Sequence, residues 1–121
     1  MKVNEIVEAI SGEILVRPGM DIELTCAFAA DLMSDILVFA QPQMLMITGL
    51  VNLQAVRTAE MSDLPAILFV RGKYPQAPIL ELAYEIGIGV LISPYTMYET
   101  CGLLYAAGLP GLGKVPILQQ A

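Results

Sequence analysis

Residues 66–93, AILFVRGKYPQAPILELAYEIGIGVLIS, decide the fold of this chain. The stretch begins with the uninterrupted apolar run 66–70 and ends with a second such run, 89–93. Between them, Pro78 suits the start of a helix, apolar residues recur at helical spacing over 79–86, and Gly87 closes the helix. A strand that is apolar at every position is typical of a parallel sheet, because crossover helices bury both of its faces. The stretch therefore predicts a β-α-β unit.

The same pattern extends in both directions from this unit. Upstream, the apolar run 44–48 predicts a strand, the turn 49–52 follows it, and 53–61 predicts a helix with Leu53, Val56 and Met61 facing inward. Downstream, Thr96 and Glu99 match a capping box that begins a helix over 97–107, and Gly108 ends it. Three buried strands, each followed by a helix, predict a single α/β domain.

The first forty residues supply the remaining elements. We expect a helix over 3–10, a short strand over 13–16, a second strand over 22–29 with Leu24, Cys26 and Phe28 on one face, and a helix over 31–40 that ends before Pro42. The expected architecture has three layers, with a mixed, mostly parallel sheet of five strands and helices on both faces. Residues 1–108 form this domain, and 109–121 form an apolar tail that contains glycine and proline.

Composition excludes several classes of protein. The 121 residues are 56% hydrophobic and 15% charged, so most of the chain cannot be disordered. Six basic against twelve acidic residues give a net charge of −6, which argues against binding nucleic acid or anionic membrane surfaces. Histidine, the usual general base near neutral pH, is absent. Since the first residues do not resemble a signal peptide, we expect a cytoplasmic protein with Cys26 and Cys101 as buried, unreactive thiols.

One glycine-rich segment superficially resembles a phosphate-binding loop. Gly108 precedes Gly113 and Lys114 at the right spacing. A functional loop of this kind needs Ser or Thr after the lysine, and it connects a strand to a helix. Here Val115 and Pro116 follow, and the segment comes after a predicted helix. We therefore predict no nucleotide hydrolysis, no kinase activity and no cofactor.

Asp31 and Asp35 lie four residues apart, beside Ser34, in the segment that we expect to be a helix. The two carboxylates would share one helix face, where they could hold Mg²⁺ or support a small Asp-dependent enzyme. The simpler explanation is that both stabilise the helix N-terminus, with Asp31 as its cap. We favour the simpler explanation and predict no metal site.

Polar residues follow the buried strands. The first strand end carries Thr48, Gly49 and Asn52, the second carries Arg71, Gly72 and Lys73, and the third carries Ser93 and Thr96. Ligands of open α/β sheets bind at the carboxyl ends of the strands. Hydroxyl groups, cations and helix N-termini suit a small anionic or nucleotide-like ligand. The alternative is ordinary turn chemistry, in which these residues only shape loops.

The segment 21–35, DIELTCAFAADLMSD, resembles the DRTGG domain family, which is similar to the N-terminal domain of HPr kinase/phosphorylase. The D-L-x-S-D element over 31–35 is the most specific part, and the likeness continues through 46–49, 66–70, 87–90 and 93–99. The resemblance adds Thr25, Asp31, Ser34 and Asp35 as a second cluster of candidate ligand contacts. Cys26 and Ala27 stand where the family motif has two glycines, and Ile22 stands where it has arginine.

The resemblance implies an α/β fold and a regulatory or dimerising role without kinase chemistry. We therefore expect a non-catalytic, ligand-sensing module that acts as a homodimer, with a purely structural dimerisation module as the alternative. A small domain can hide only part of its apolar surface, and this chain has a mean hydropathy of +0.67. We place the dimer interface on the last helix, where Leu103, Leu104 and Tyr105 are consecutive, and on the tail from Leu109 to Leu118.

Overall fold

A computed structural model describes residues 1–117 of the chain. The elements in chain order are α1 (Val3–Ala9), β1 (Glu13–Val16), β2 (Cys26–Ala29), α2 (Met33–Phe39), β3 (Met44–Thr48), α3 (Leu53–Met61), β4 (Ala66–Phe69), α4 (Ala77–Ile86), β5 (Gly89–Ile92) and α5 (Met97–Ala106). Within residues 1–117, no helix combines the length and the hydropathy that crossing a bilayer requires.

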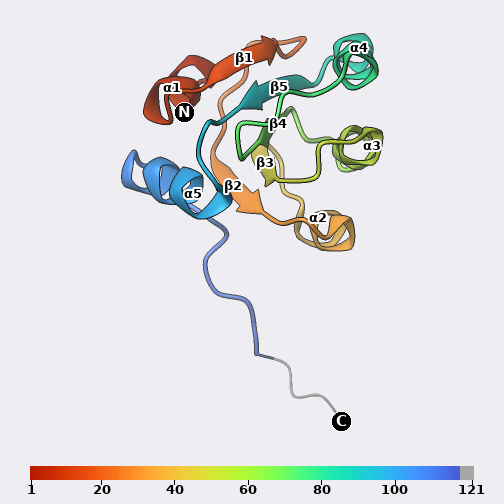
Figure 1. Ribbon diagram of the computed structural model, residues 1–121. Coiled ribbons are helices and arrows are strands. Elements are labelled where there is room, and N and C mark those ends of the chain that lie inside the picture. Colours follow the sequence, from red (N-terminus) through yellow and green to blue (C-terminus); the bar gives the residue numbers. More distant parts are fainter. Residues whose placement is uncertain (118–121) are drawn as a thin grey trace.

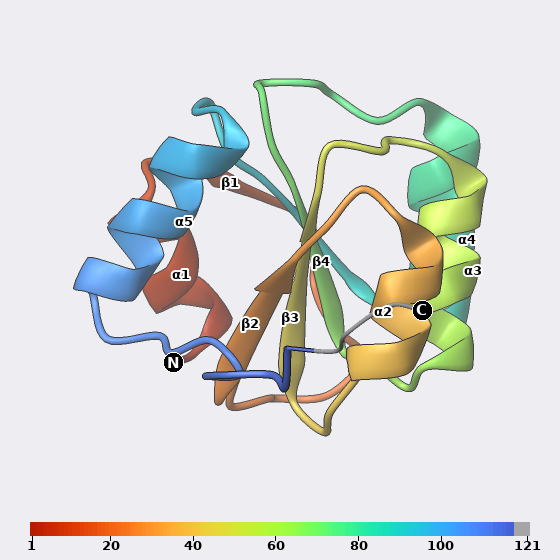
Figure 2. The same cartoon turned by 90° about the horizontal axis from the view of Figure 1, so that it is seen from below.

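The five strands form one sheet in the order β1-β5-β4-β3-β2. Strands β2 to β5 pair in parallel with their neighbours, and β1 joins β5 antiparallel at one edge. Helices α2, α3 and α4 cover one face of the sheet, and α1 and α5 cover the other (Figures 1 and 2). The predicted α/β class, the mixed, mostly parallel sheet and the three layers are therefore confirmed.

Each face of the sheet has its own hydrophobic core. In β3, Met44 and Met46 pack toward α2, α3 and α4, whereas Leu45 and Ile47 pack toward α1 and α5. All four side chains are fully buried. The strand lacks a polar position because successive side chains point to opposite faces and both faces are covered.

Two predictions about side-chain orientation are wrong. The strand expected over 22–29 begins only at Cys26, and Leu24 packs on the α1 side while Cys26 and Phe28 pack on the α2 side. The difference arises because the Leu24 N–H donates to the Met1 carbonyl instead of joining a strand ladder.

In α3, Leu53 and Met61 are exposed, and the inward residues are Ala55, Val56, Thr58 and Ala59. Small residues at the contact let the helix lie close to the sheet. The predicted face was therefore rotated, and only Val56 was placed correctly.

The helix ends show which caps the sequence determines locally. Asn52 accepts a hydrogen bond from Ala55 N–H at 2.9 Å, and Gly87 ends α4 in the left-handed region, both as turn chemistry predicts. The capping box at Thr96 is not formed, because the Thr96 side chain makes no cap hydrogen bond. Asp31 is not the cap of α2, since Leu32 occupies the cap position.

The first residues of the tail belong to the domain. Leu109 is buried beneath α1 and α5, and the Pro110 carbonyl accepts a hydrogen bond from Ala27 N–H at 2.9 Å. Leu112 then packs against the core on the α2 side. The tail thus crosses the outer edge of β2 from one face of the sheet to the other before it leaves the body (Figures 1 and 2). Leu118, included in the predicted interface, lies outside the described residues.

Candidate ligand site at the carboxyl edge of the sheet

The Asp31 carboxylate holds the turn that follows β3. Its Oδ1 accepts hydrogen bonds from Gly49 N–H at 2.7 Å and from Thr48 Oγ1 at 3.1 Å. The Thr48 hydroxyl oxygen in turn accepts from Leu50 N–H at 3.2 Å. Asp31 therefore shares no helix face with Asp35, and the expected carboxylate pair on α2 is absent because α2 begins only at Met33.

Gly49 lies between a carboxylate and a guanidinium. A Cβ at Gly49 would lie 3.4 Å from Asp31 Oδ1, 3.5 Å from Asp31 Oδ2 and 3.8 Å from Arg71 Nε. Asp31 follows β2, Gly49 follows β3, and Arg71 follows β4, so three adjacent strands bring these groups together. The Cβ position of Gly49 thus lies between two opposite charges, and the exposed side chains of Asp31 and Arg71 are the groups that a ligand can reach.

Backbone hydrogen bonds fix the position of Arg71. Its N–H donates to the Tyr95 carbonyl at 2.7 Å, and Gly72 N–H donates to the Ser93 carbonyl at 2.8 Å. Arg71 has a φ of 70°, a left-handed conformation that is uncommon for residues other than glycine. The loop after β4 is thus tied to the loop after β5, and the Arg71 side chain is presented toward Gly49.

The loop after β5 is built from its own hydroxyl network. Ser93 Oγ and Thr100 Oγ1 lie 2.8 Å apart and share a hydrogen bond, and Ser93 Oγ also accepts from Tyr95 N–H at 3.1 Å. Both side chains are buried.

The carboxyl ends of β4 and β5 are where an open α/β sheet usually has its ligand crevice, because the chain turns to opposite faces of the sheet after these two strands (Figure 1). Here the two backbone bonds from Arg71 and Gly72 bridge it, and the exposed groups nearby are the side chains of Asp31 and Arg71.

The cations at this edge form no ion pair within 4.0 Å in residues 1–117. The ion pairs within 4.0 Å in residues 1–117 join the N-terminus to Glu23, Lys2 to Asp21 and Arg57 to Glu60. Arg71 and Lys73 are exposed and belong to none of them. An exposed guanidinium without an ion pair, on a backbone held by hydrogen bonds, is suited to a carboxylate or phosphate group.

The structure brings together only part of the predicted site. Asp31, Thr48 and Gly49 lie beside Arg71. The sequence analysis placed Arg71 at a strand end but did not select it as a ligand contact. Asn52 caps α3, and Ser93 shares a hydrogen bond with Thr100, which no sequence pattern singled out. The remaining predicted residues do not join the cluster: Thr25 pairs with Gln43 at the opposite end of the strands, Ser34 and Asp35 lie on α2, and Thr96 is exposed at the start of α5.

The larger hollows lie elsewhere. A hollow of about 170 Å³ adjoins Gly72, Ser93 and Pro94, next to the site. Two of about 370 and 410 Å³ lie at the amino ends of the strands and share Ile22, Asp63 and Pro65. A third, of about 290 Å³, has Arg17 and Asp21 among its lining residues. We favour the carboxyl edge because a carboxylate and a guanidinium converge there. The hollows of about 370 and 410 Å³ have no cation among their lining residues, and the one buried hydroxyl without a partner near them is that of Ser62. No cluster of three or more Cys, Asp or Glu side chains suited to a metal ion occurs within 1–117.

Comparison with known proteins identifies a shared fold. No family model matches the chain, and no curated protein matches it. A solved structure of the CBS and DRTGG domains of the regulatory region of Clostridium perfringens pyrophosphatase, complexed with its activator diadenosine tetraphosphate, superposes with a TM-score of 0.72 at 17% identity. The two proteins share a fold. The match covers 89% of this chain and 47% of that chain, and it supports a DRTGG-like architecture.

Proposed function

We propose that this chain is a non-catalytic regulatory module that acts as a homodimer and binds a small anionic or nucleotide-like ligand at the carboxyl edge of its sheet. The observation that carries the proposal is Arg71, which is held by backbone hydrogen bonds, unpaired within 1–117, and set across Gly49 from the Asp31 carboxylate. The fold shared with a regulatory region that binds a dinucleotide activator supports the same class of function.

The two charged groups would recognise different parts of such a ligand. The Arg71 guanidinium donates paired hydrogen bonds to a phosphate, and Asp31 Oδ2, which makes no hydrogen bond in the described chain, accepts from a sugar hydroxyl. Both side chains are exposed, and Gly49 places no side chain of its own between them. A ligand that bridges Asp31 and Arg71 would also link the turn after β3 to the loop that starts α5, since Arg71 is bonded to Tyr95. Binding could in this way reach the helix on which we place the dimer interface.

The same geometry argues against catalysis. The hydroxyls of Thr48 and Ser93 are buried and engaged in hydrogen bonds inside the domain, so neither is presented as a nucleophile. The chain has no histidine to act as a base. In the tail, Gly113 and Lys114 are exposed, and no helix begins between them and residue 117.

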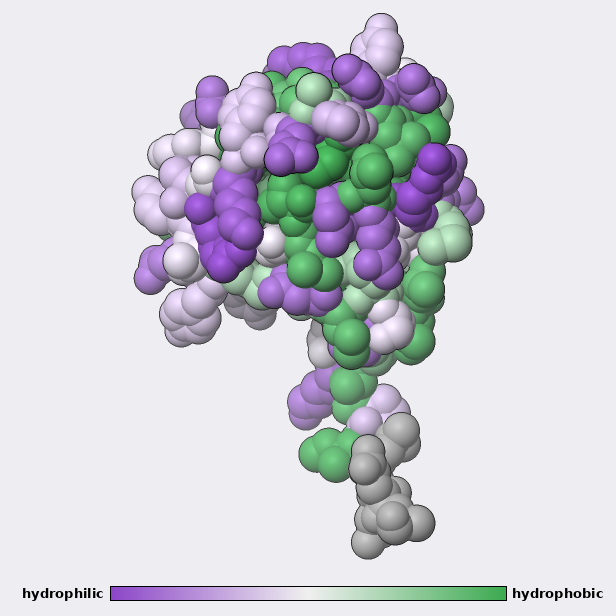
Figure 3. Space-filling model, turned by 45° about the vertical axis from the view of Figure 1, so that its right-hand side comes forward, coloured by the Kyte–Doolittle hydropathy of each residue, from purple (hydrophilic) through white to green (hydrophobic). Residues whose placement is uncertain are grey.

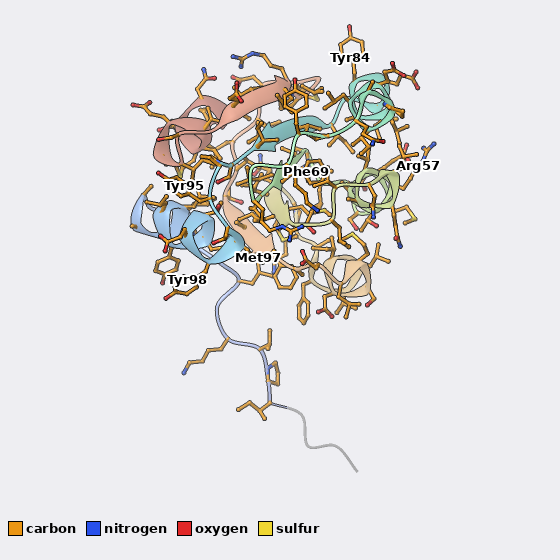
Figure 4. All side chains as sticks on the ribbon, viewed as in Figure 1. Arg57, Phe69, Tyr84, Tyr95, Met97 and Tyr98 are labelled. Carbon is orange, nitrogen blue, oxygen red and sulfur yellow. The ribbon has the colours of Figure 1, made fainter. Side chains whose placement is uncertain are left out.

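The homodimer is proposed from exposed apolar surface. Tyr98 and Tyr105 of α5 are 87% and 73% exposed, and Leu103 is partly exposed. Figure 4 shows Tyr98 at the beginning of α5, on the side of the molecule away from Arg57 and Tyr84. Apolar and aromatic side chains on one helix commonly mark an interface.

Calorimetric titration tests the ligand site. We expect heat of binding from at least one of inorganic phosphate, AMP, ATP and diadenosine tetraphosphate, and at least tenfold weaker binding to Arg71→Ala. Arg57→Ala is the matched control, because Arg57 is also exposed but lies on α3 and pairs with Glu60. The site is wrong if Arg71→Ala binds as tightly as the original chain, and ligand sensing is wrong if none of the four probes binds.

A purely structural dimerisation module is the second candidate. It is favoured by the Thr48, Ser93 and Asn52 side chains, whose hydrogen bonds are made inside the domain as in ordinary turns. A dimer by light scattering that binds none of the four probes would support this candidate over the first.

A further inference from the structure

Strand β2 is an outer strand whose edge is only partly covered. It lies at the end of the sheet, next to β3 alone. Ala27 directs its N–H outward, to the Pro110 carbonyl of the tail. Backbone groups alternate along a strand, so Ala29 also presents its N–H and C=O to the outside. An edge of this kind can accept a further strand.

An apolar slot lies beside this edge, on the α5 face of the sheet. It has a volume of about 110 Å³, and Ala29, Ile47, Cys101, Leu104, Tyr105 and Pro110 are among its lining residues. That volume suits one branched aliphatic side chain. The small side chains of Ala27 and Ala29 are what leave the slot open.

The tail of the same chain carries a segment of matching chemistry. Beyond Leu112 it leaves the body (Figures 1 and 3), with Val115 54% exposed and Ile117 fully exposed. In an extended segment, Val115 and Ile117 point to one face and hydrogen-bond in one direction. Pro116 lies between them, so its missing N–H would face away from a neighbouring strand, where proline is tolerated. The segment can therefore add to a sheet edge.

A chain does not place this segment in its own slot as the structure stands. Pro110 and Gly111 already line the slot, and Leu112 packs on the opposite face of the sheet. Residues 113–117 consequently start on the α2 side and lead away from the body (Figure 1). The segment of a second copy approaches from outside and meets no such constraint.

We propose that residues 114–117 of one copy pair with the β2 edge of a second copy at Ala29, and that Ile117 fills the slot beside Cys101. The arrangement is reciprocal, as in a two-fold dimer, and backbone pairing supplies affinity while the slot supplies specificity. This inference rests on the homodimer proposed above and names its contact. An apolar peptide of another protein is the competing occupant.

A disulfide between copies tests the contact. Ile117→Cys places a thiol on the tail, and native Cys101 lines the slot. Treatment with diamide, which takes up the two hydrogens, should give a covalent dimer on a non-reducing gel. The doubly substituted chain Cys101→Ser with Ile117→Cys should not give one. Tyr84→Cys is the second control, because Tyr84 is exposed on α4, on the other face (Figure 4), and it should cross-link at least tenfold less.

Light scattering on the unoxidised chains separates the two proposals. A chain that is dimeric in solution but whose Ile117→Cys variant forms no more covalent dimer than Tyr84→Cys overturns the tail contact and leaves the homodimer intact. An internal disulfide within one copy also overturns it, because the tail would then occupy its own slot. A monomer at all concentrations overturns both proposals. In a dimer, Ile117→Asp should weaken association at least tenfold, since it removes the buried side chain without touching the domain.

Discussion

Replacing Asp31 tests whether its carboxylate is part of the architecture of the carboxyl edge. In Asp31→Ala, the buried Gly49 N–H loses its acceptor at 2.7 Å and the Thr48 hydroxyl loses its partner at 3.1 Å. A buried group left without a hydrogen bond costs about 1–3 kcal/mol. Asp31 itself is exposed, so water can partly replace it, and we expect a loss of about 2 kcal/mol in the free energy of unfolding. In a domain of this size that corresponds to a fall of about 8 °C in Tm.

Two matched variants serve as comparisons for the loss of unfolding free energy expected in Asp31→Ala. Asp31→Asn keeps an oxygen for Gly49 N–H, but the bond is no longer charge-assisted, so the expected loss is about half as large, near 1 kcal/mol. Asp35→Ala removes a carboxylate that makes no side-chain hydrogen bond in residues 1–117, and only its interaction with the start of α2 is lost, about 0.5 kcal/mol. The ordering of the three losses is therefore the prediction.

Urea unfolding followed by circular dichroism measures all three losses. Protein concentration is held fixed, because association would make the midpoint depend on it. An unchanged slope with a lower midpoint would confirm that stability alone has changed. If Asp31→Ala unfolds within about 0.5 kcal/mol of the original chain, a difference typical of neutral surface substitutions, the assigned role of Asp31 is refuted.

Two further predictions concern glycine and cysteine. Gly12→Ala would drive its Cβ into the Ile92 carbonyl oxygen and should lower the free energy of unfolding in urea by at least about 2 kcal/mol. Gly102→Ala has open space around it on α5 and should raise the free energy of unfolding by up to about 1 kcal/mol through helix propensity. Equal effects of the two substitutions would contradict the packing described. Burial raises the pKa of the Cys101 thiol, so at a given pH less of it is thiolate, and iodoacetamide should label it more slowly, with a midpoint at higher pH, than in the unfolded chain. Cys26 is buried and should resist labelling until the chain unfolds, and rapid labelling of either thiol in the folded chain would contradict this prediction.

Local patterns were sufficient for most of the fold. The apolar runs 44–48, 66–70 and 89–93 predicted buried parallel strands, and the structure pairs all three. The turn ending at Asn52 and the helix end at Gly87 were predicted correctly, because a cap depends only on residues within a few positions of it. The inward face of α3 was predicted wrongly, because the placement of small residues against the sheet depends on how closely the layers pack.

The candidate site depended on contacts between distant segments. Asp31 and Gly49 are 18 residues apart, and nothing near Asp31 distinguishes an acceptor for the turn after β3 from a helix cap. The position of Arg71 depends on its hydrogen bond to Tyr95 in the loop after β5. The position of the first tail residues depends on the hydrogen bond between Pro110 and the outer edge of β2. The sequence by itself determined which segments are strands and helices, because periodicity and turn chemistry are local. Only the tertiary structure decided which polar groups meet, because that follows from the strand order β1-β5-β4-β3-β2 and from which strand is left at the edge.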